Sequence, residues 1–132
     1  MTSRAEIESL SLKKMQFKEL SIDGEAKRPQ VEIETEHFVV DHKTLVINLD
    51  ANVVLEPMFE LGTMYQMVVS CDDAENLENI PVEISYLVMS EVSLLLSTLT
   101  KATRSVPFVI DAGDLLSFAG FDDGRLTVNT KN

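Results

Sequence analysis

The sequence contains a single cysteine and two histidines, which limits the chemistry it can perform. Cys71 cannot form a disulfide within the chain, and the negative charges of Asp72 and Asp73 beside it raise the pKa of a thiol. His37 and His42 would point to opposite faces of a strand that ran through both, and further ligands at a suitable spacing are absent. We therefore expect neither a disulfide, nor a reactive thiol, nor a metal site.

Glycine is also scarce, and none of the five glycines belongs to a loop pattern that cradles phosphate groups. Asp111 and Asp114 could act as paired carboxylates, but an aspartate followed by Gly113 and a short helical segment is more typical of a turn and a helix cap. The sequence therefore predicts no catalytic residue and no cofactor, and we do not expect an enzyme.

Long apolar runs are missing as well. No segment reaches the roughly 18 consecutive apolar residues of a membrane span, because Glu83, Glu91 and several serines interrupt the most hydrophobic stretch, residues 82–99. Residues 1–14 lack the apolar core of a secretory signal. Together with the lone cysteine, these absences predict a cytoplasmic protein that does not insert into a membrane.

Basic side chains are few, since 11 Lys and Arg residues stand against 22 Asp and Glu residues and give a formal net charge of -11. This charge repels phosphate backbones and anionic lipids, so nucleic acid is not expected as a partner. It either serves solubility alone or also attracts basic peptides. With 132 residues and 45% hydrophobic side chains, we predict a single domain over residues 1–132, with flexible ends at 1–13 and 122–132.

Apolar side chains alternate with a period of two through the middle of the chain, which predicts antiparallel strands. The expected strands span residues 14–22, 31–40, 44–56 and 58–70. The third has the most regular pattern, with one apolar face formed by Leu45, Ile47, Leu49, Ala51, Val53 and Leu55.

The beginning of the chain is less regular. Residues 3–13 show only weak helical spacing, through Ile7 and Leu10, and are expected to form a frayed end or a short helix. In the first expected strand the apolar phase changes after Phe17, which indicates either a bulge near Lys18 or a strand contacted on both faces.

Helical spacing of apolar residues follows Ile80 and Pro81 and predicts a long helix over residues 82–103. Residues 106–110 should be extended, and residues 112–118 should form a short second helix before a tail. The order of elements predicts an α+β fold, in which a four-stranded antiparallel sheet is followed by a long helix and a short C-terminal helix.

The last expected strand, residues 58–70, has large side chains on both faces: Phe59 and Tyr65 on one, Met58 and Met64 on the other. An ordinary half-buried strand needs only one apolar face. The second face therefore predicts a partner, and a symmetric dimer or tetramer would supply one. Methionine side chains are flexible and polarizable, so they can adapt to varied apolar partners.

Several short motifs, in this order of elements, resemble the SecB family of export chaperones. KELSID at residues 18–23 looks like the KDISFE-type strand of that family, and Met58-Phe59-Glu60 is similar to its Leu-x-Glu element. Ile80-Pro81 with Tyr86 resembles its helix start. SVPFVIDAGDLLSF, residues 105–118, resembles its Gly-x-Phe-Pro segment and the Asn-Phe-Asp-x-Leu-Phe that follows.

Two positions depart from the pattern of the family. Tyr86 is followed by Leu87 and Val88 rather than by a nearby arginine, and the glycine of the Gly-x-Phe-Pro segment is replaced within residues 103–106. A SecB-like protein that chaperones another client, such as an antitoxin, fits these residues equally well.

The resemblance implies dimers that assemble into a tetramer, and long apolar grooves that hold unfolded polypeptide without nucleotide hydrolysis. By position, the residues that would dock the translocase ATPase SecA are Glu19, Asp23, Met58 and Glu60. We expect the client groove to be lined by Phe17, Phe59, Met64, Tyr65, Met67 and Met89.

Two further functions stay open. The same surfaces could serve an interaction protein dedicated to one partner, such as an antitoxin, or a pocket between sheet and helix could hold an apolar small ligand. Suppressed aggregation of several unrelated unfolded proteins would favour the general chaperone, whereas a co-purifying small molecule would favour the ligand binder.

Overall fold

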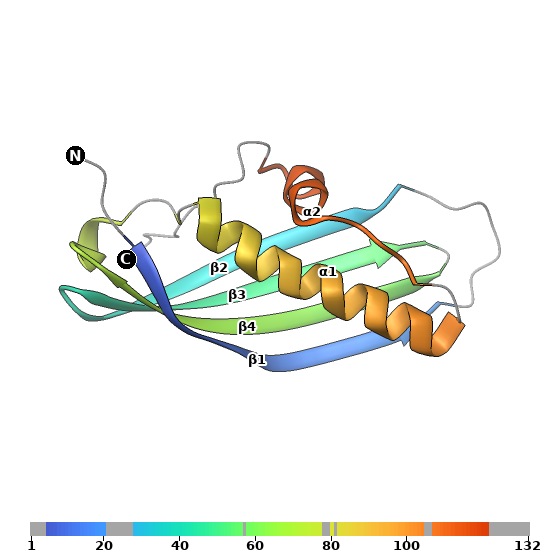
Figure 1. Ribbon diagram of the computed structural model, residues 1–132, viewed down its shortest axis with the longest axis horizontal. Coiled ribbons are helices and arrows are strands. Elements are labelled where there is room, and N and C mark those ends of the chain that lie inside the picture. The colour runs from blue at the N-terminus through green and yellow to red at the C-terminus, as the bar shows by residue number, and fades with distance from the viewer. Residues whose placement is uncertain are drawn as a thin grey trace.

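Four long antiparallel strands form one sheet in the order β1-β4-β3-β2, and a long helix crosses one of its faces (Figure 1). The computed structural model describes residues 5–20, 28–56, 58–77, 80, 82–104 and 107–121. The strands are β1 (Ala5–Glu19), β2 (Gln30–Asp41), β3 (Thr44–Leu55) and β4 (Phe59–Cys71). A short 3₁₀ turn, η1 (Ala74–Asn76), precedes the helices α1 (Val82–Arg104) and α2 (Ala112–Phe118). The predicted α+β fold is confirmed.

Each central strand has one buried face, which we call the helix face because α1 covers it. All six in-phase apolar residues of β3, from Leu45 to Leu55, are buried, as the alternation predicts. In β4 every second residue from Phe59 to Cys71 is buried, and the residues between them are half-buried on the opposite, open face of the sheet. The hydrophobic core therefore lies between the helix face and α1.

The expected frayed end or short helix at the beginning of the chain is wrong from Ala5 onward, because these residues belong to β1. The pairing of β1 with β4 shifts register between Ile7 and Ser9 and again between Leu12 and Lys14. Each β-bulge inserts one extra residue, so apolar side chains three positions apart stay on the same face. Spacing by three also occurs in helices, which explains the weak helical signal.

The pairing from Lys14 to Glu19 runs without a register shift, so the bulge expected near Lys18 is not found there. The strand continues to Leu20, whose main-chain N–H donates to the carbonyl of Met58 at 3.0 Å. Residues 21–27 lie outside the described part of the chain, and Ile22 and Asp23 are among them.

α1 covers the helix face with the apolar stripe that its spacing predicts, and the stripe is buried at Ile84, Val88, Met89, Val92 and Leu96. By length and average hydropathy α1 could also cross a membrane, but a core helix of a soluble protein meets the same test. The mean hydropathy of α1 is high although single polar residues interrupt it, so a count of consecutive apolar residues does not identify α1 as a possible membrane span.

Residues 107–110 are extended, as expected, and run beside α1. The main-chain N–H of Phe108 donates to the Thr100 hydroxyl at 2.7 Å, and the Ser93 hydroxyl donates to the carbonyl of Ile110. Since Ser93 and Thr100 are two helical turns apart, they bind this segment at both of its ends. The segment then leads into α2.

α2 begins and ends with standard capping geometry. The Asp111 carboxylate accepts a hydrogen bond from the N–H of Asp114 at 2.8 Å, which confirms the predicted turn and cap. At the other end Gly120 has φ +93, a backbone angle that glycine adopts without strain, and Phe121 N–H donates to the carbonyl of Leu116 at 2.8 Å. α2 packs against α1 and β2.

Candidate functional site

Most of the residues expected to line a client groove lie inside the core. Phe59, Met67 and Met89 are fully buried between the sheet and α1, and Tyr65 is nearly so. Burial raises the pKa of the Tyr65 hydroxyl, and the negative charge of Glu91 adds to the effect. These side chains could contact a client only if α1 moved away from the sheet, so their role in a groove stays a prediction.

Phe17 is half-buried and belongs to an aromatic cluster on the helix face. Its ring centroid lies 5.8 Å from that of Phe59, which in turn lies 5.4 Å from the ring of Phe108 in an edge-to-face arrangement. The groove residues expected from the sequence do not include Phe108. Two hydrogen bonds bind residues 107–110 to α1, and Phe108 packs against the core beside them. No local pattern in the sequence indicates these contacts.

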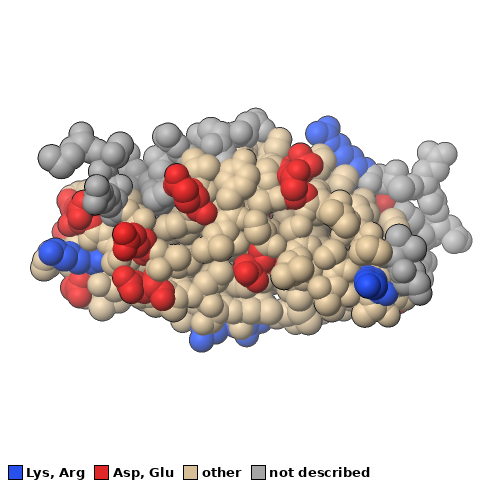
Figure 2. All heavy atoms as spheres, viewed as in Figure 1, with Lys and Arg blue, Asp and Glu red and all other residues tan. Residues whose placement is uncertain are grey.

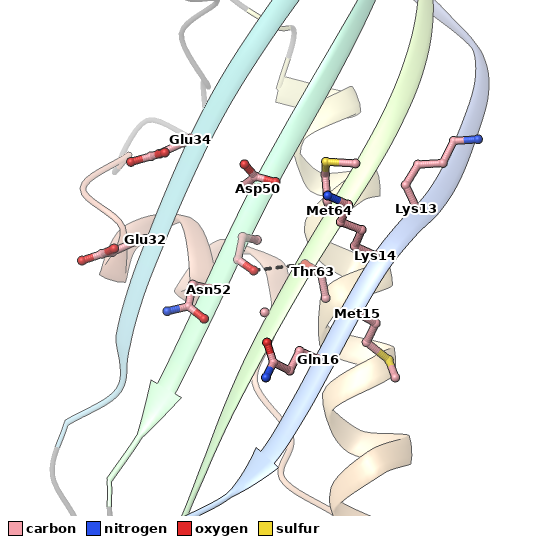
Figure 3. Close-up of a pocket in the computed structure, with 12 residues that line it drawn as sticks. Lys13, Lys14, Met15, Gln16, Glu32, Glu34, Asp50, Asn52, Thr63 and Met64 are labelled. Atoms are coloured by element: carbon pink, nitrogen blue, oxygen red, sulfur yellow. Dashed lines mark hydrogen bonds between the residues drawn. The ribbon is translucent and has the colours of Figure 1, made fainter.

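Met64 is on the open face, away from the other expected groove residues. It lies opposite Lys14 of β1 on one side and Asp50 of β3 on the other. Figure 3 shows all three side chains on the same side of the sheet. The expected groove set therefore does not form one surface in this structure.

Among the expected docking residues, Glu19, Met58 and Glu60 meet at one end of the β1–β4 pair. Glu19 pairs with Phe59 and so has the orientation of the helix face, whereas Glu60 lies on the open face opposite Lys18. Asp23 lies outside the described residues. Their role in docking a translocase stays a prediction.

A second group of apolar side chains is exposed on the side of the molecule that carries α1. Met15 of β1 is 45% exposed and Leu94 of α1 is 61% exposed; Leu12, Tyr86, Leu87 and Val109 are exposed as well. Figure 2 views this side, where uncharged atoms predominate over α1. None of these residues is among the site residues expected from the sequence, although the seven-residue spacing of Leu87 and Leu94 places both on one stripe of a helix.

The open face contains a broad hollow of about 810 Å³ between β1 and β2. Charged and polar side chains line it together with apolar groups: Lys13, Lys14, Gln16, Glu32, Glu34, Asp50 and Asn52 contribute the former, and Met15, Ala51 and Met64 the latter (Figure 3). Gly62 has no side chain to fill it, and an added Cβ there would lie 3.6 Å from the Asn52 Oδ1, an ordinary contact. The hollow can accept polar and charged groups.

The ionisable residues determine whether the chain could hold a metal ion or a reactive thiol. In the described part of the chain, no group of three or more His, Cys, Asp or Glu residues could hold a metal ion. Burial raises the pKa of the Cys71 thiol and the charges of Asp72 and Asp73 raise it further, although a hydrogen bond from the Asp73 backbone opposes them. This environment disfavours the thiolate, which is the reactive form.

No model of a known protein family matches this chain, and no curated protein matches its sequence. Solved structures are similar in fold. A SecB-like chaperone from Mycobacterium tuberculosis, Rv1957, in complex with a ChAD peptide from the Rv1956 HigA1 antitoxin, has a TM-score of 0.59 at 10% identity and covers 82% of this chain and 88% of its own. A protein of unknown function from Streptococcus agalactiae has a TM-score of 0.58 at 12% identity, covering 84% and 99%. The chain therefore has a SecB-like fold.

Proposed function

We propose that this protein is a SecB-like, ATP-independent chaperone that holds unfolded polypeptide through exposed apolar side chains. The observation that carries the proposal is the set of exposed leucine, methionine and aromatic side chains along β1 and α1. Apolar surface of this kind on a small acidic domain is typical of an interaction site. The similar fold of Rv1957, whose structure contains a bound peptide, supports a polypeptide as the partner.

Leu12 and Met15 are the side chains best placed to contact a client. Both have the orientation of the helix face, because Leu12 pairs with Tyr65 and Met15 with Thr63, yet both are exposed. Leucine and methionine contact varied apolar groups with little geometric demand, which suits a binder that is unselective in sequence. Client contact through these residues leaves the core intact.

The test is suppression of aggregation by the full chain, measured by light scattering on several unrelated unfolded proteins. We expect the double variant Leu12→Glu/Met15→Glu to lose most of this activity while remaining folded. The matched control is Ser9→Glu/Ser11→Glu, which adds the same charge to the open face of the same strand and should keep the activity. If the wild-type chain suppresses none of these aggregations, the proposal is wrong.

A protein dedicated to one partner is the second candidate, because the peptide bound to Rv1957 comes from an antitoxin. That function would give tight binding to one sequence and little effect on unrelated unfolded proteins. The same aggregation measurements separate the two candidates. A role in export through SecA, a cytoplasmic location and assembly into a dimer or tetramer belong to the proposal as well.

A further inference from the structure

The two edges of the sheet differ in how well they are protected against pairing with another chain. β1 has two bulges and the side chains of Lys13, Lys14 and Lys18, and bulges and lysines both prevent edge-to-edge pairing. Residues 30–40 of β2 contain no lysine, arginine or proline, and the pairing of β2 with β3 is regular from Gln30 to Val39, with a register shift at the hairpin end between Val39 and Asp41. β2 is therefore the edge that can accept a further strand.

A regular antiparallel edge directs the N–H and C=O groups of every second residue away from the sheet. The regular part of β2 is about 33 Å long at the usual rise per residue, which matches an extended peptide of roughly ten residues. α2 packs against β2 from the helix face, whereas the side chains of Glu32, Glu34 and Glu36 are exposed on the open face. Figure 3 shows Glu32 and Glu34 pointing outward past β2.

The charges along this edge indicate what kind of peptide fits. Glu34 lies directly opposite Asp50 of β3, and both side chains are exposed. Like charges in directly opposite positions destabilise a sheet. Glu32 and Glu36 are the next residues on the same face of β2, so a series of carboxylates follows the edge. A neighbouring strand with lysine or arginine at alternate positions would offset this repulsion.

The end of β2 near the hairpin is apolar instead. Phe38 is 50% exposed and lies opposite Val46, which in turn lies opposite Val68 of β4 on the open face. Val40 is exposed beside them. An apolar side chain of an added strand would be covered here, whereas it would not be covered beside the glutamates.

We propose that the β2 edge binds an extended, basic segment of a client as a fifth strand of the sheet. Alternate lysine or arginine side chains lie over Glu32, Glu34 and Glu36, and an apolar side chain lies on Phe38. The proposal rests on the proposed function, since it names the sequence class that the protein binds and the place of binding. A second copy of this chain is a poor occupant, because two β2 edges would bring their glutamates together.

The experiment uses the full chain and a fluorescent ten-residue peptide in which lysine alternates with threonine and one end is leucine. We expect Glu32→Lys/Glu34→Lys/Glu36→Lys to weaken its binding by about tenfold, the combined effect of three exposed charge pairs. The matched control, Asp72→Lys/Glu75→Lys/Glu83→Lys, makes the same change of net charge at exposed residues elsewhere and should bind the peptide as the wild type does. Equal loss in both variants would show attraction by net charge alone and overturn the proposal.

Amide hydrogen exchange supplies a second measurement, because a fifth strand would protect alternate amides of residues 30–39 when the peptide binds. Binding without this protection overturns the proposal, and so does concentration-dependent protection in the free protein, which would mean that a second copy occupies the edge. The two proposals can fail separately. Aggregation suppression without peptide binding at β2 rejects only the edge site, whereas binding at β2 without suppression rejects only the general chaperone.

Discussion

The hydroxyl of Thr100, on the buried side of α1, accepts a hydrogen bond from the main-chain N–H of Phe108 at 2.7 Å and donates one to the carbonyl of Leu96 at 2.7 Å. Thr100 thereby connects the long helix to the segment that precedes α2. Phe108 contacts the ring of Phe59, so the same residue also positions one member of the aromatic cluster.

We predict that Thr100→Val destabilises the protein by about 1–2 kcal/mol, because the Phe108 N–H loses its partner in a partly buried place. Urea denaturation measures this loss, and amide exchange at Phe108 locates it. The control is Thr98→Val, whose hydroxyl bonds only to the carbonyl of Leu94 on the exposed side of α1 and should matter little. Equal effects of the two variants would contradict the role of Thr100.

Substitution of Met67 by a charged residue should unfold the protein or cost at least about 3 kcal/mol, since its side chain is 0% exposed. If Met67 lined an open groove, as the sequence led us to expect, such a change would leave the fold intact; its burial predicts the opposite. The comparison is Met15→Glu, which changes an exposed methionine and should lower the free energy of unfolding by less than about 1 kcal/mol. Circular dichroism and urea denaturation measure the folding and the stability of both variants. A stable Met67→Glu variant would contradict the packing of α1 on the sheet.

Oligomerisation should depend on the exposed side of α1. Leu94 is 61% exposed on a side with few charges, so contact with a second copy would bury it. We expect Leu94→Lys to lower the sedimentation coefficient of the assembly. The control, Asn76→Lys, adds the same charge at an exposed place outside α1 and should leave the sedimentation coefficient unchanged. A wild-type protein that is a strict monomer at micromolar concentration would exclude a SecB-type assembly.

The export role predicts salt-sensitive binding to the basic, zinc-stabilised tail of a translocase through Glu19, Asp23 and Glu60. Because Glu19 and Glu60 have opposite orientations on the sheet, a partner on one face should respond strongly to only one of the two charge reversals. Titration of the tail with Glu19→Lys and Glu60→Lys, at low and high salt, tests this. Aggregation suppression without any binding to the tail would leave the chaperone proposal standing and exclude the export role.

Cys71 should react slowly with iodoacetamide in the folded protein, since burial raises the pKa of its thiol. The unfolded thiol ionises near its usual pKa of about 8.5, while a larger share of the folded thiol keeps its proton at that pH. The folded state therefore binds more protons than the unfolded state. The stabilisation that this thiol contributes is fully present below the pKa of the unfolded thiol, and it is lost as the pH rises through the higher pKa of the folded thiol. Mass spectrometry follows the reaction, and Asp72→Asn should accelerate it only slightly because burial is the larger cause.

The strands with regular alternation could be predicted from the sequence. In β3, six apolar residues occur in phase from Leu45 to Leu55, and only one arrangement of the strand buries them all. α1 and α2 were predictable for similar reasons, because the helical spacing, Pro81 and the Asp111 cap are local signals.

β1 and the site could not be predicted in the same way. A bulge depends on the partner strand, so the spacing of Ile7 and Leu10 has no unique local meaning until β4 lies beside it. Met64 and Met67 are equally apolar, yet one lies on the open face and the other is buried under α1. Residue type alone does not separate a core methionine from an exposed one.

The sequence by itself determined the order of the elements, the acidic charge and the buried face of β3, because side-chain periodicity and capping act over a few residues. The tertiary structure alone decided which apolar side chains stay exposed, and which two strands lie at the edges of the sheet. Those properties depend on contacts between residues far apart in the chain, such as Thr100 with Phe108 and Glu34 with Asp50. The pattern of any single segment does not contain them.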